Sequence, residues 1–401
     1  MDFQQFGSIS TLHRLRTDNT PQLEQELKAF RHRRPVALVL PALASEMDGP
    51  ALGAIVEQLR GVRYLEEIVL ALDRSDAASF RRARKFFAGI KTDLRILWVH
   101  GPRVQKVLKS FSKADLDIGP EGKGRTAWLA FGFVLAQRRC RVIALHDCDI
   151  LTYERDLLAR LVYPVANPRQ AYEFAKGYYP RYTTQFHGRV MRLFVTPLIN
   201  ALQRILGHHP LLEYYSSFRY ALAGEFALTT DLMRNLRFPS DWGLEVGVLA
   251  EVYRHASAKH VCQVGILGNY DHKHQPLSPR DRTKGLQRMA ADIAKSLFRI
   301  LAQEGLMLGS GHFKTLEAAY LRAAQDAIQQ YHDDARINGL DFDRHLEEVA
   351  VETFLAALIY AAGEFEKDPL GAPMIPSWAR VEAALPDLGG ALLTAVEADN
   401  S

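Results

Sequence analysis

The first part of the chain alternates between short apolar runs and segments of helical period. Four runs rich in Val, Ile and Leu have the length of strands: PVALVLPAL (35–43), LEEIVLALD (65–73), DLRILWVH (93–100) and CRVIALHDCD (140–149). Nearly continuous apolar runs of this kind are typical of strands that are buried on both faces of a sheet. The segments between them, GPALGAIVEQLRGV, ASFRRARKFFAGI and GRTAWLAFGFVLAQRR, have helical patterns. This alternation predicts an α/β fold with a parallel sheet flanked by helices.

Beyond this alternating region the pattern changes to helices alone. GLQRMAADIAKSLFRILAQEG, TLEAAYLRAAQDAIQQYHDDARI, HLEEVAVETFLAALIYAAGEFE and WARVEAALPDLGGALLTAVEA are amphipathic segments separated by Gly and Pro. The polar residues before the first apolar run predict an extension that contains one helix. We therefore expect three parts: an N-terminal extension (1–34), an α/β domain (35–284) and a C-terminal helical region (285–401).

One long apolar segment, MRLFVTPLINALQRILGHHPLLEYY, needs to be distinguished from a membrane span. It is interrupted by Arg192, Pro197, Arg204 and Pro210, and its apolar residues recur at helical spacing. It predicts an amphipathic helix against a core or a partner, with a membrane-surface role as the weaker alternative. No uninterrupted apolar run reaches membrane-spanning length, and MDFQQFGSISTLHRL lacks the regions of a signal peptide, so neither an integral membrane segment nor a signal peptide is expected.

The composition narrows the classes of function. Of 401 residues, 48% are hydrophobic and 24% charged, which is an ordinary globular composition with ample length for a large core. The formal net charge is only +4, so a nucleic-acid-binding protein is not indicated, although a local basic pocket for phosphates is compatible with it. Cys140, Cys148 and Cys262 lack metal-knuckle spacing and cannot form a disulfide framework. We expect reduced thiols and a cytoplasmic protein.

Two aspartates follow the fourth apolar run, in the sequence HDCD. Asp147 and Asp149 are i and i+2 in an extended segment, so their side chains point the same way. Ligands of parallel α/β sheets bind at the carboxyl ends of strands, where two carboxylates can address one hard cation such as Mg²⁺ and the phosphates that share it. The alternative is a helix cap plus a surface carboxylate. A bare D-x-D is a weak motif, and its place at the end of a strand makes it moderately specific.

A glycine-rich loop, GPEGKGRTAWL, opens the helix that precedes this strand. Its order differs from G-x-x-x-x-G-K-[ST], and no G-x-G-x-x-G follows the first apolar run, which argues against ATPase and dinucleotide-binding functions. Lys123 in this loop either contacts a phosphate as a point charge or is a solvated lysine. The residues alone leave both interpretations open.

Histidines and arginines gather in two later segments. His272 and His274 lie in the polar turn YDHKHQPL; a lone histidine is more often structural, but two in one turn favour a metal ligand that joins carboxylates. GYYPRYTTQFHGRVMRL contains Arg181, Arg189 and Arg192, whose guanidinium forks suit phosphate or carboxylate, although a solvated loop is the alternative.

Two glutamates are flanked by apolar residues. Glu225 lies in LAGEFAL and Glu245 in SDWGLEVGVL. A carboxylate in such surroundings is often a satisfied structural group, and it is also a candidate site residue.

Taken in order, these motifs resemble those of the glucosyl-3-phosphoglycerate synthase family. The matching segments are PALASE, LALDRSD, GKG, HDCD, GRV, AGEFAL, WGLEVG and DHKHQPL, and they extend over roughly residues 35–280. The resemblance implies a GT-A fold, in which a mixed sheet flanked by helices binds the nucleotide sugar, with a nucleotide-binding half at 35–150 and an acceptor half at 151–284. It also implies a retaining glycosyltransferase that moves glucose from UDP- or GDP-glucose to 3-phosphoglycerate with Mg²⁺ or Mn²⁺, in glucosylglycerate synthesis.

The resemblance assigns roles to residues on the donor side. Asp147 would hold the donor sugar, and Asp149 and His272 would bind the metal. Lys123 would contact the diphosphate or the sugar, and Glu245 would lie beside the transferred sugar. The nucleotide-sugar site would further include Pro41, Ala42, Leu43, Glu46 on the ribose, Ser75 near the base and ribose, and Cys148.

On the acceptor side the chain departs from the family pattern. Gly188 and Arg189 would face the phosphate or carboxylate of the acceptor. The departures are Met191 in place of a threonine on the acceptor phosphate, Trp242 in place of a tyrosine, and His274 and Gln275 in place of Asn and Arg. The residues therefore support the assignment of the nucleotide-sugar donor better than the assignment of the acceptor. D-glycerate is an alternative acceptor, and mannose an alternative transferred sugar.

Two other functions fit parts of the pattern. A nucleotidyltransferase usually has a glycine-rich signature after its first strand, where this chain has PALASEMDG. A non-catalytic nucleotide-sugar-binding protein would use the C-terminal helices as a partner surface. The residues alone do not separate retention from inversion, since an inverting enzyme would need a positioned carboxylate base. A homodimer is expected from the family and from the spare apolar faces of the C-terminal helices.

Overall fold

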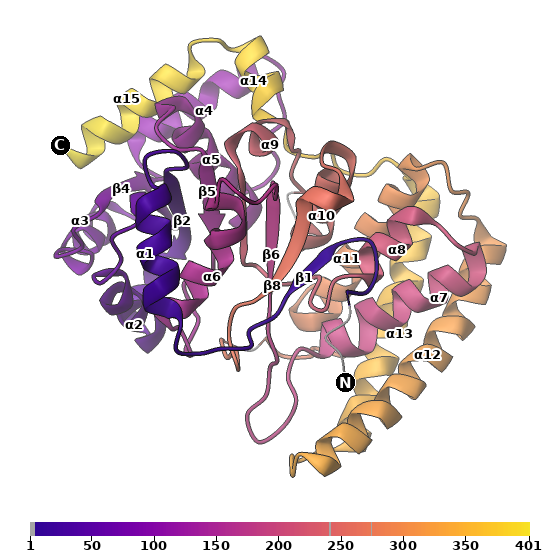
Figure 1. Cartoon of the computed structure of the whole chain (residues 1–401). Helices are drawn as coiled ribbons and strands as arrows, with labels where there is room; N and C mark the ends of the chain where they lie inside the picture. Colours follow the sequence, from indigo (N-terminus) through magenta and orange to yellow (C-terminus); the bar gives the residue numbers. More distant parts are fainter. Residues whose placement is uncertain (1–4, 240–241, 274) are drawn as a thin grey trace.

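The computed structural model describes residues 5–239, 242–273 and 275–401. Its central element is one sheet (Figure 1). Within these residues eight strands pair in the order β1-β8-β6-β7-β5-β2-β3-β4. Their bounds are β1 (Ser10–Leu12), β2 (Val36–Leu43), β3 (Leu65–Asp73), β4 (Asp93–Trp98), β5 (Val142–Leu145), β6 (Phe174–Tyr178), β7 (Phe226–Thr229) and β8 (Val261–Gly265). The predicted α/β class and its four strands are confirmed, although the fourth ends at Leu145. Strand β1, within the predicted N-terminal extension, was not expected.

Strand β7 runs antiparallel to both of its neighbours, β5 and β6, whereas the other pairs of the sheet are parallel. Because Leu145 at the end of β5 pairs with Phe226 at the start of β7, the residues that follow β5 and those that precede β7 meet at one edge of the sheet. This reversal brings the HDCD and AGEF motifs together.

Helices cover both faces of the sheet and divide the apolar residues into two cores. Residues of β2 alternate between them: Ala37 and Val39 enter one core, and Val36, Leu38 and Leu40 the other. One face carries α1 (Thr20–Phe30), α2 (Pro50–Leu59), α3 (Ala77–Phe86) and α6 (Arg155–Ala166), and the other carries α4 (Pro102–Lys113) and α5 (Lys123–Gln137). The strands are therefore buried on both sides, as their continuous apolar runs predict.

The long apolar segment folds into three short helices of the core. They are the π-helix η2 (Val190–Val195), α7 (Thr196–Leu206) and α8 (Pro210–Ser216). Pro197 lies in the first turn of α7 and Pro210 begins α8, where a missing backbone N–H costs nothing. The apolar face of α7 packs against α12, so the prediction of a core helix is confirmed. Within the described part of the chain, no helix combines the length and apolarity needed to cross a bilayer.

The remaining helices connect the sheet to the C-terminus. They are η1 (Ala44–Asp48), α9 (Thr230–Asn235), α10 (Leu244–His255), η3 (Ala258–His260), α11 (Gly285–Gln303), α12 (Ser310–Ile337), α13 (Arg344–Lys367), α14 (Trp378–Ala384) and α15 (Leu388–Asn400). Helices α11, α12 and α13 pack around η2, whereas α15 returns to α4, α5 and β4 (Figure 1). The C-terminal helices thus pack against both halves of the α/β domain, and the last predicted segment forms two helices separated near Pro386.

The end of the chain closes the outer edge of β4. The Asn400 side chain accepts a hydrogen bond from Ile96 N and donates one to Ile96 O, both at 2.9 Å, as a neighbouring strand would. Glu397 lies 2.8 Å from Arg95 Nε, which anchors the same helix to the same strand. An uncovered edge strand invites pairing with other chains, and α15 prevents it.

Helix α14 is locked to α5 by two stacked indoles. The ring centroids of Trp128 and Trp378 are 4.5 Å apart, and Trp378 Nε1 donates to Trp128 O at 2.9 Å. This close approach requires Gly132, because a Cβ at that position would overlap the Trp378 ring.

We therefore expect Gly132→Ala to destabilise the fold. Overpacking against the buried Trp378 should cost about 1–3 kcal/mol, more than the helix propensity that alanine adds. Gly363→Ala is the matched control, because Gly363 lies inside α13 with no heavy atom within 4 Å of its added Cβ. This control should gain up to about 1 kcal/mol. Chemical denaturation measures both, and equal shifts of the two variants would contradict the packing argument.

Candidate active site

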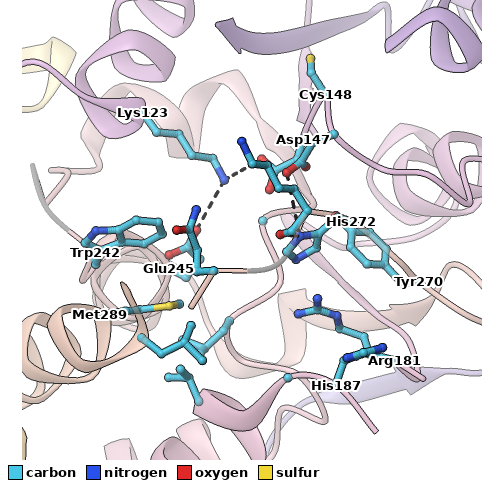
Figure 2. Close-up of a pocket in the computed structure, with 18 of the residues that line it drawn as sticks. Lys123, Asp147, Cys148, Arg181, His187, Trp242, Glu245, Tyr270, His272 and Met289 are labelled. Atoms are coloured by element: carbon cyan, nitrogen blue, oxygen red, sulfur yellow. Dashed lines mark hydrogen bonds and ion pairs between the residues drawn. The ribbon is translucent and has the colours of Figure 1, made fainter. Parts of the chain in front are cut away.

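A cavity of about 580 Å³ opens at the carboxyl ends of β2, β3 and β5. The predicted site residues that line it are Pro41, Ala42, Leu43, Glu46, Lys123, Asp147, Cys148, Asp149, Gly188, Arg189, Met191, Trp242, Glu245 and His272. Segments far apart in the sequence thus meet in one space, as Figure 2 shows for Lys123, Trp242, Glu245 and His272.

Two predicted residues are not among these lining residues. His274 lies outside the described residues. Ser75 is buried beside the cavity: its Oγ lies 3.4 Å from Leu72 O, and its carbonyl accepts a hydrogen bond from Trp98 Nε1. The backbone turns at Arg74, with φ of 43°, and carries Ser75 away from the wall. Asp73 and Arg74 line the cavity at the end of β3 instead.

Lys123 lies between two carboxylates at the start of α5 (Figure 2). Its Nζ is 2.6 Å from Asp147 Oδ1 and 3.7 Å from Glu245 Oε1. Burial in the cavity would lower the pKa of Lys123, but the two carboxylates outweigh burial and raise it. Burial would raise the pKa of Asp147, and the Lys123 ammonium holds it below its usual value. The pair is therefore ionised, with a donor and an acceptor directed into one small space.

Gly224 makes this arrangement possible. It lines the cavity opposite the ion pair, and a Cβ there would lie 2.8 Å from Asp147 Oδ2 and 3.1 Å from Lys123 Nζ. Gly224 comes directly before Glu225, in the segment that the antiparallel strand β7 brings beside Asp147. Any larger residue would push the carboxylate away from its present position.

Asp149 and His272 lie together because their segments pair. Ile150 and His272 form an antiparallel bridge, and Leu151 N donates to Asp271 O at 2.8 Å. Asp149 Oδ2 is 3.9 Å from His272 Nδ1, which in turn lies 2.6 Å from Lys273 O. A backbone carbonyl that accepts from one ring nitrogen is the usual support of a metal-binding histidine.

The carboxylates around Asp149 and His272 are not fully balanced by nearby positive charges. Burial and the nearby Asp147 charge raise the pKa of Asp149 to about 6, and burial and the Asp149 charge raise that of Glu46 to about 7. A divalent cation would relieve this repulsion. Among the described residues no three His, Cys, Asp or Glu side chains form a closed metal cage. The donor set instead suits Mg²⁺ or Mn²⁺, which bind one or two protein ligands and complete their shell with phosphate oxygens and water.

Glu225 supports the cavity from behind. It is fully buried and accepts hydrogen bonds of 2.7 Å from Tyr179 and Tyr270, whose rings stack 3.9 Å apart. Burial and the Asp147 charge raise the pKa of Glu225, and the two hydroxyl donors oppose that rise. The sequence left open whether Glu225 and Glu245 are structural or site residues. In the structure Glu245 lines the cavity, whereas Glu225 lies behind it and binds the two tyrosines that line it.

Arginines form another part of the cavity wall. Gly188 has φ of 71°, Arg189 follows it, and Met191 is buried in the wall inside η2. Arg181 also lines this part, with Nη1 donating to Tyr220 at 3.0 Å. Trp242 lies at the mouth, where it remains 41% exposed.

Sequence reasoning missed a carboxylate behind these arginines. Glu347 in α13 lies 2.7 Å from Arg189 and 3.0 Å from Arg192. A signal was present: Glu347 precedes the buried Ala350, Val351 and Phe354 at helical spacing, so the periodicity put a charge on an apolar face.

The architecture is that of the GT-A glycosyltransferases, and solved structures share it. Glucosyl-3-phosphoglycerate synthase from Mycobacterium tuberculosis, solved with Mn²⁺, UDP-glucose and phosphoglyceric acid, has a TM-score of 0.54 and 20% identity, covering 75% of this chain and 89% of that one. Mannosyl-3-phosphoglycerate synthase from Rubrobacter xylanophilus also has a TM-score of 0.54 and 20% identity, with 75% and 83% covered. At these identities the likeness concerns the fold alone.

Curated relatives define the family. The glucosyl-3-phosphoglycerate synthase of Persephonella marina is 46% identical over 400 residues, which are 100% of this chain and 99% of that protein. That of Methanococcoides burtonii is 38% identical over 404 residues, with 100% and 98% covered. No protein-family model matches the chain. The chain belongs to the glucosyl-3-phosphoglycerate synthase family of glycosyltransferases, as the sequence motifs predict.

Gly224→Ala should weaken the binding of the nucleotide sugar without unfolding the protein. The added methyl group displaces the Asp147 carboxylate or the Lys123 ammonium, and the loss of one charged hydrogen bond should raise Kd about tenfold or more. Calorimetric titration with UDP-glucose and Mg²⁺ measures this change. Gly53→Ala in α2, where the nearest atom would be 3.9 Å from the added Cβ, should bind as the unmodified protein does. Equal Kd values for all three proteins would contradict the proposed need for a glycine.

Proposed function

We propose that this protein transfers glucose from a nucleotide sugar, UDP- or GDP-glucose, to 3-phosphoglycerate, with retention at the anomeric carbon. The observation that carries this proposal is the combination of groups that line one cavity. The Lys123–Asp147 ion pair, the Asp149–His272 pair and the arginines Arg181 and Arg189 all border the same space. The family of the chain, and the UDP-glucose and phosphoglyceric acid bound by the Mycobacterium tuberculosis enzyme, support the same combination of a donor and an acceptor.

On the donor side, the wall at the end of β2 would hold the nucleotide through Pro41, Ala42 and Leu43, with Glu46 on the ribose. Asp147 would accept hydrogen bonds from the hydroxyls of the donor sugar. Lys123 would donate to the diphosphate, because its charge is maintained by the carboxylates on either side. Trp242 at the mouth would cover the sugar or the acceptor.

A divalent cation bound by Asp149 and His272 would neutralise the charge that develops on the leaving diphosphate. The acceptor oxygen forms its bond to the anomeric carbon as the bond to the diphosphate oxygen breaks. The attack comes from the face that the diphosphate leaves, which gives retention, and the acceptor hydroxyl proton passes to a diphosphate oxygen on that face. Glu245 would lie beside the transferred sugar and orient it, with Lys123 3.7 Å away.

On the acceptor side, Arg189 would bind the phosphate or carboxylate of 3-phosphoglycerate and Gly188 would allow close approach. The buried Met191 supplies no hydrogen-bond donor, and this observation favours D-glycerate as a second candidate acceptor. A non-catalytic nucleotide-sugar-binding function would predict binding without turnover.

The first experiment incubates the purified protein with Mg²⁺, UDP-glucose or GDP-glucose, and either 3-phosphoglycerate or D-glycerate. We expect nucleoside diphosphate release and a product of the mass of glucosyl-3-phosphoglycerate, and NMR of the anomeric proton then establishes retention. Turnover with D-glycerate alone would replace the proposed acceptor. Binding without turnover on either acceptor would support the non-catalytic function.

Asp149→Ala should reduce turnover on the order of a hundredfold or more, because the loss of a cation ligand removes several kcal/mol of transition-state stabilisation. In the same variant the affinity for UDP should no longer depend on Mg²⁺, and the melting temperature should be unchanged. Asp333→Ala is the control, since Asp333 is an exposed carboxylate of α12. If Asp149→Ala keeps full activity with Mg²⁺, the proposed metal role is wrong.

A further inference from the structure

One buried carboxylate holds two arginines beside the cavity. Glu347 Oε1 accepts from Arg189 Nε at 2.7 Å, and Glu347 Oε2 accepts from Arg192 Nη2 at 3.0 Å. Glu347 and Arg192 are buried, whereas Arg189 is partly exposed and lines the cavity. The carboxylate comes from α13, more than 150 residues further along the chain than either arginine.

The π-helix η2 sets the spacing of the two arginines. Arg189 precedes η2 and Arg192 lies within it, and both reach the same carboxylate. Backbone N of Arg192 donates to Gly188 O at 3.0 Å, so the turn that starts at Gly188 is closed. Short π-helical turns are uncommon and frequently occur at functional sites.

Arg192 is fixed on its other sides. Its guanidinium carbon lies 4.7 Å from the centroid of the Tyr331 ring, and its Nε donates to His187 O at 2.9 Å. It can therefore move little, and Glu347, bound to it, is fixed in turn. The edge of the cluster that a ligand can reach is that of Arg189, which lines the cavity. Within the described part of the chain its Nε donates to Glu347, and both terminal amino groups remain for a ligand.

We propose that Glu347 is a positioning residue for the acceptor: it holds the Nε edge of Arg189 so that the terminal amino groups of that guanidinium face the acceptor anion. This inference rests on the proposed function, because the anion is the phosphate or carboxylate of 3-phosphoglycerate. Glu347 itself does not line the cavity and acts through Arg189. The C-terminal helices thereby take part in acceptor binding.

A purely electrostatic role for Glu347 predicts the opposite result. One carboxylate between two guanidinium groups reduces the positive charge near the acceptor, so its neutralisation alone would strengthen anion binding. Positioning predicts weaker binding, because glutamine presents an N–H donor to one of two arginines that also only donate. The sign of the change in KM therefore distinguishes the two roles.

The test compares Glu347→Gln and Glu347→Asp with the unmodified protein. Glutamine should raise the KM for 3-phosphoglycerate about tenfold or more, with kcat at saturation and the KM for UDP-glucose little changed. Aspartate keeps the charge but withdraws the carboxylate by one methylene, so it should raise the same KM severalfold, whereas a role of charge alone predicts no change. Calorimetric titration of 3-phosphoglycerate, with UDP and Mg²⁺ present, measures binding independently of turnover.

Glu251→Gln is the matched control. Glu251 is likewise buried and lies between two arginines, Arg237 at 2.8 Å and Arg254 at 3.3 Å, and none of the three lines the cavity. It should lower the melting temperature about as much as Glu347→Gln and leave the KM for 3-phosphoglycerate unchanged.

An unchanged or lower KM in Glu347→Gln would overturn the positioning role while leaving the proposed function intact. An equal rise in Glu251→Gln would also overturn it, because the effect would then reflect general destabilisation. If the unmodified protein binds 3-phosphoglycerate without turnover, the proposed function fails and the calorimetric comparison still decides the role of Glu347. If the unmodified protein does not bind 3-phosphoglycerate, both inferences fail.

Discussion

The site depends on charge compensation around a single lysine. Lys123 lies between Asp147 and Glu245, and without it two carboxylates would face each other across a small space with no counter-charge. Isolated charges away from water are costly. Each charged group of the cavity is therefore either paired within the protein or would be paired by a bound ion. The raised pKa values of Asp149 and Glu46 mark the part of the cavity where the protein supplies too little positive charge. A divalent cation would supply that charge.

The sheet makes this concentration of charge possible. An all-parallel sheet would carry the residues before β7 to the far edge, away from those that follow β5. Because β7 is antiparallel, Gly224 approaches Asp147, and Glu225 holds Tyr179 and Tyr270 beneath the same cavity. One reversal in strand direction thus accounts for the narrow space around the Lys123–Asp147 pair and for the two tyrosines that lie beneath it.

The sequence predicts the fold where the physical signal is local. Continuous apolar runs mark β2 to β5, and helical periodicity marks the C-terminal helices, because both depend on burial patterns along a few residues. Strand β1 has only three residues and no such pattern. The meeting of Glu347 with Arg189 depends on how α13 packs across η2, which no local pattern encodes. Ser75 lies beside the cavity and not in its lining for a related reason: a single left-handed residue, Arg74, redirects the backbone. Motif residues such as Leu43, Asp147 and Asp149 lie at or just after strand ends, where topology determines position.

Segments far apart in the sequence form the two edges of the sheet: β1 is the edge strand beside β8, and Asn400 pairs with β4 at the other edge. Asn400 follows Ile96 of β4 by 304 residues. During synthesis the chain must therefore carry an open β4 edge until α15 has been made, and this side of the native sheet is completed only then. Truncation before Asn400 would leave an adhesive edge on an otherwise folded chain, and a chaperone would have a reason to bind it.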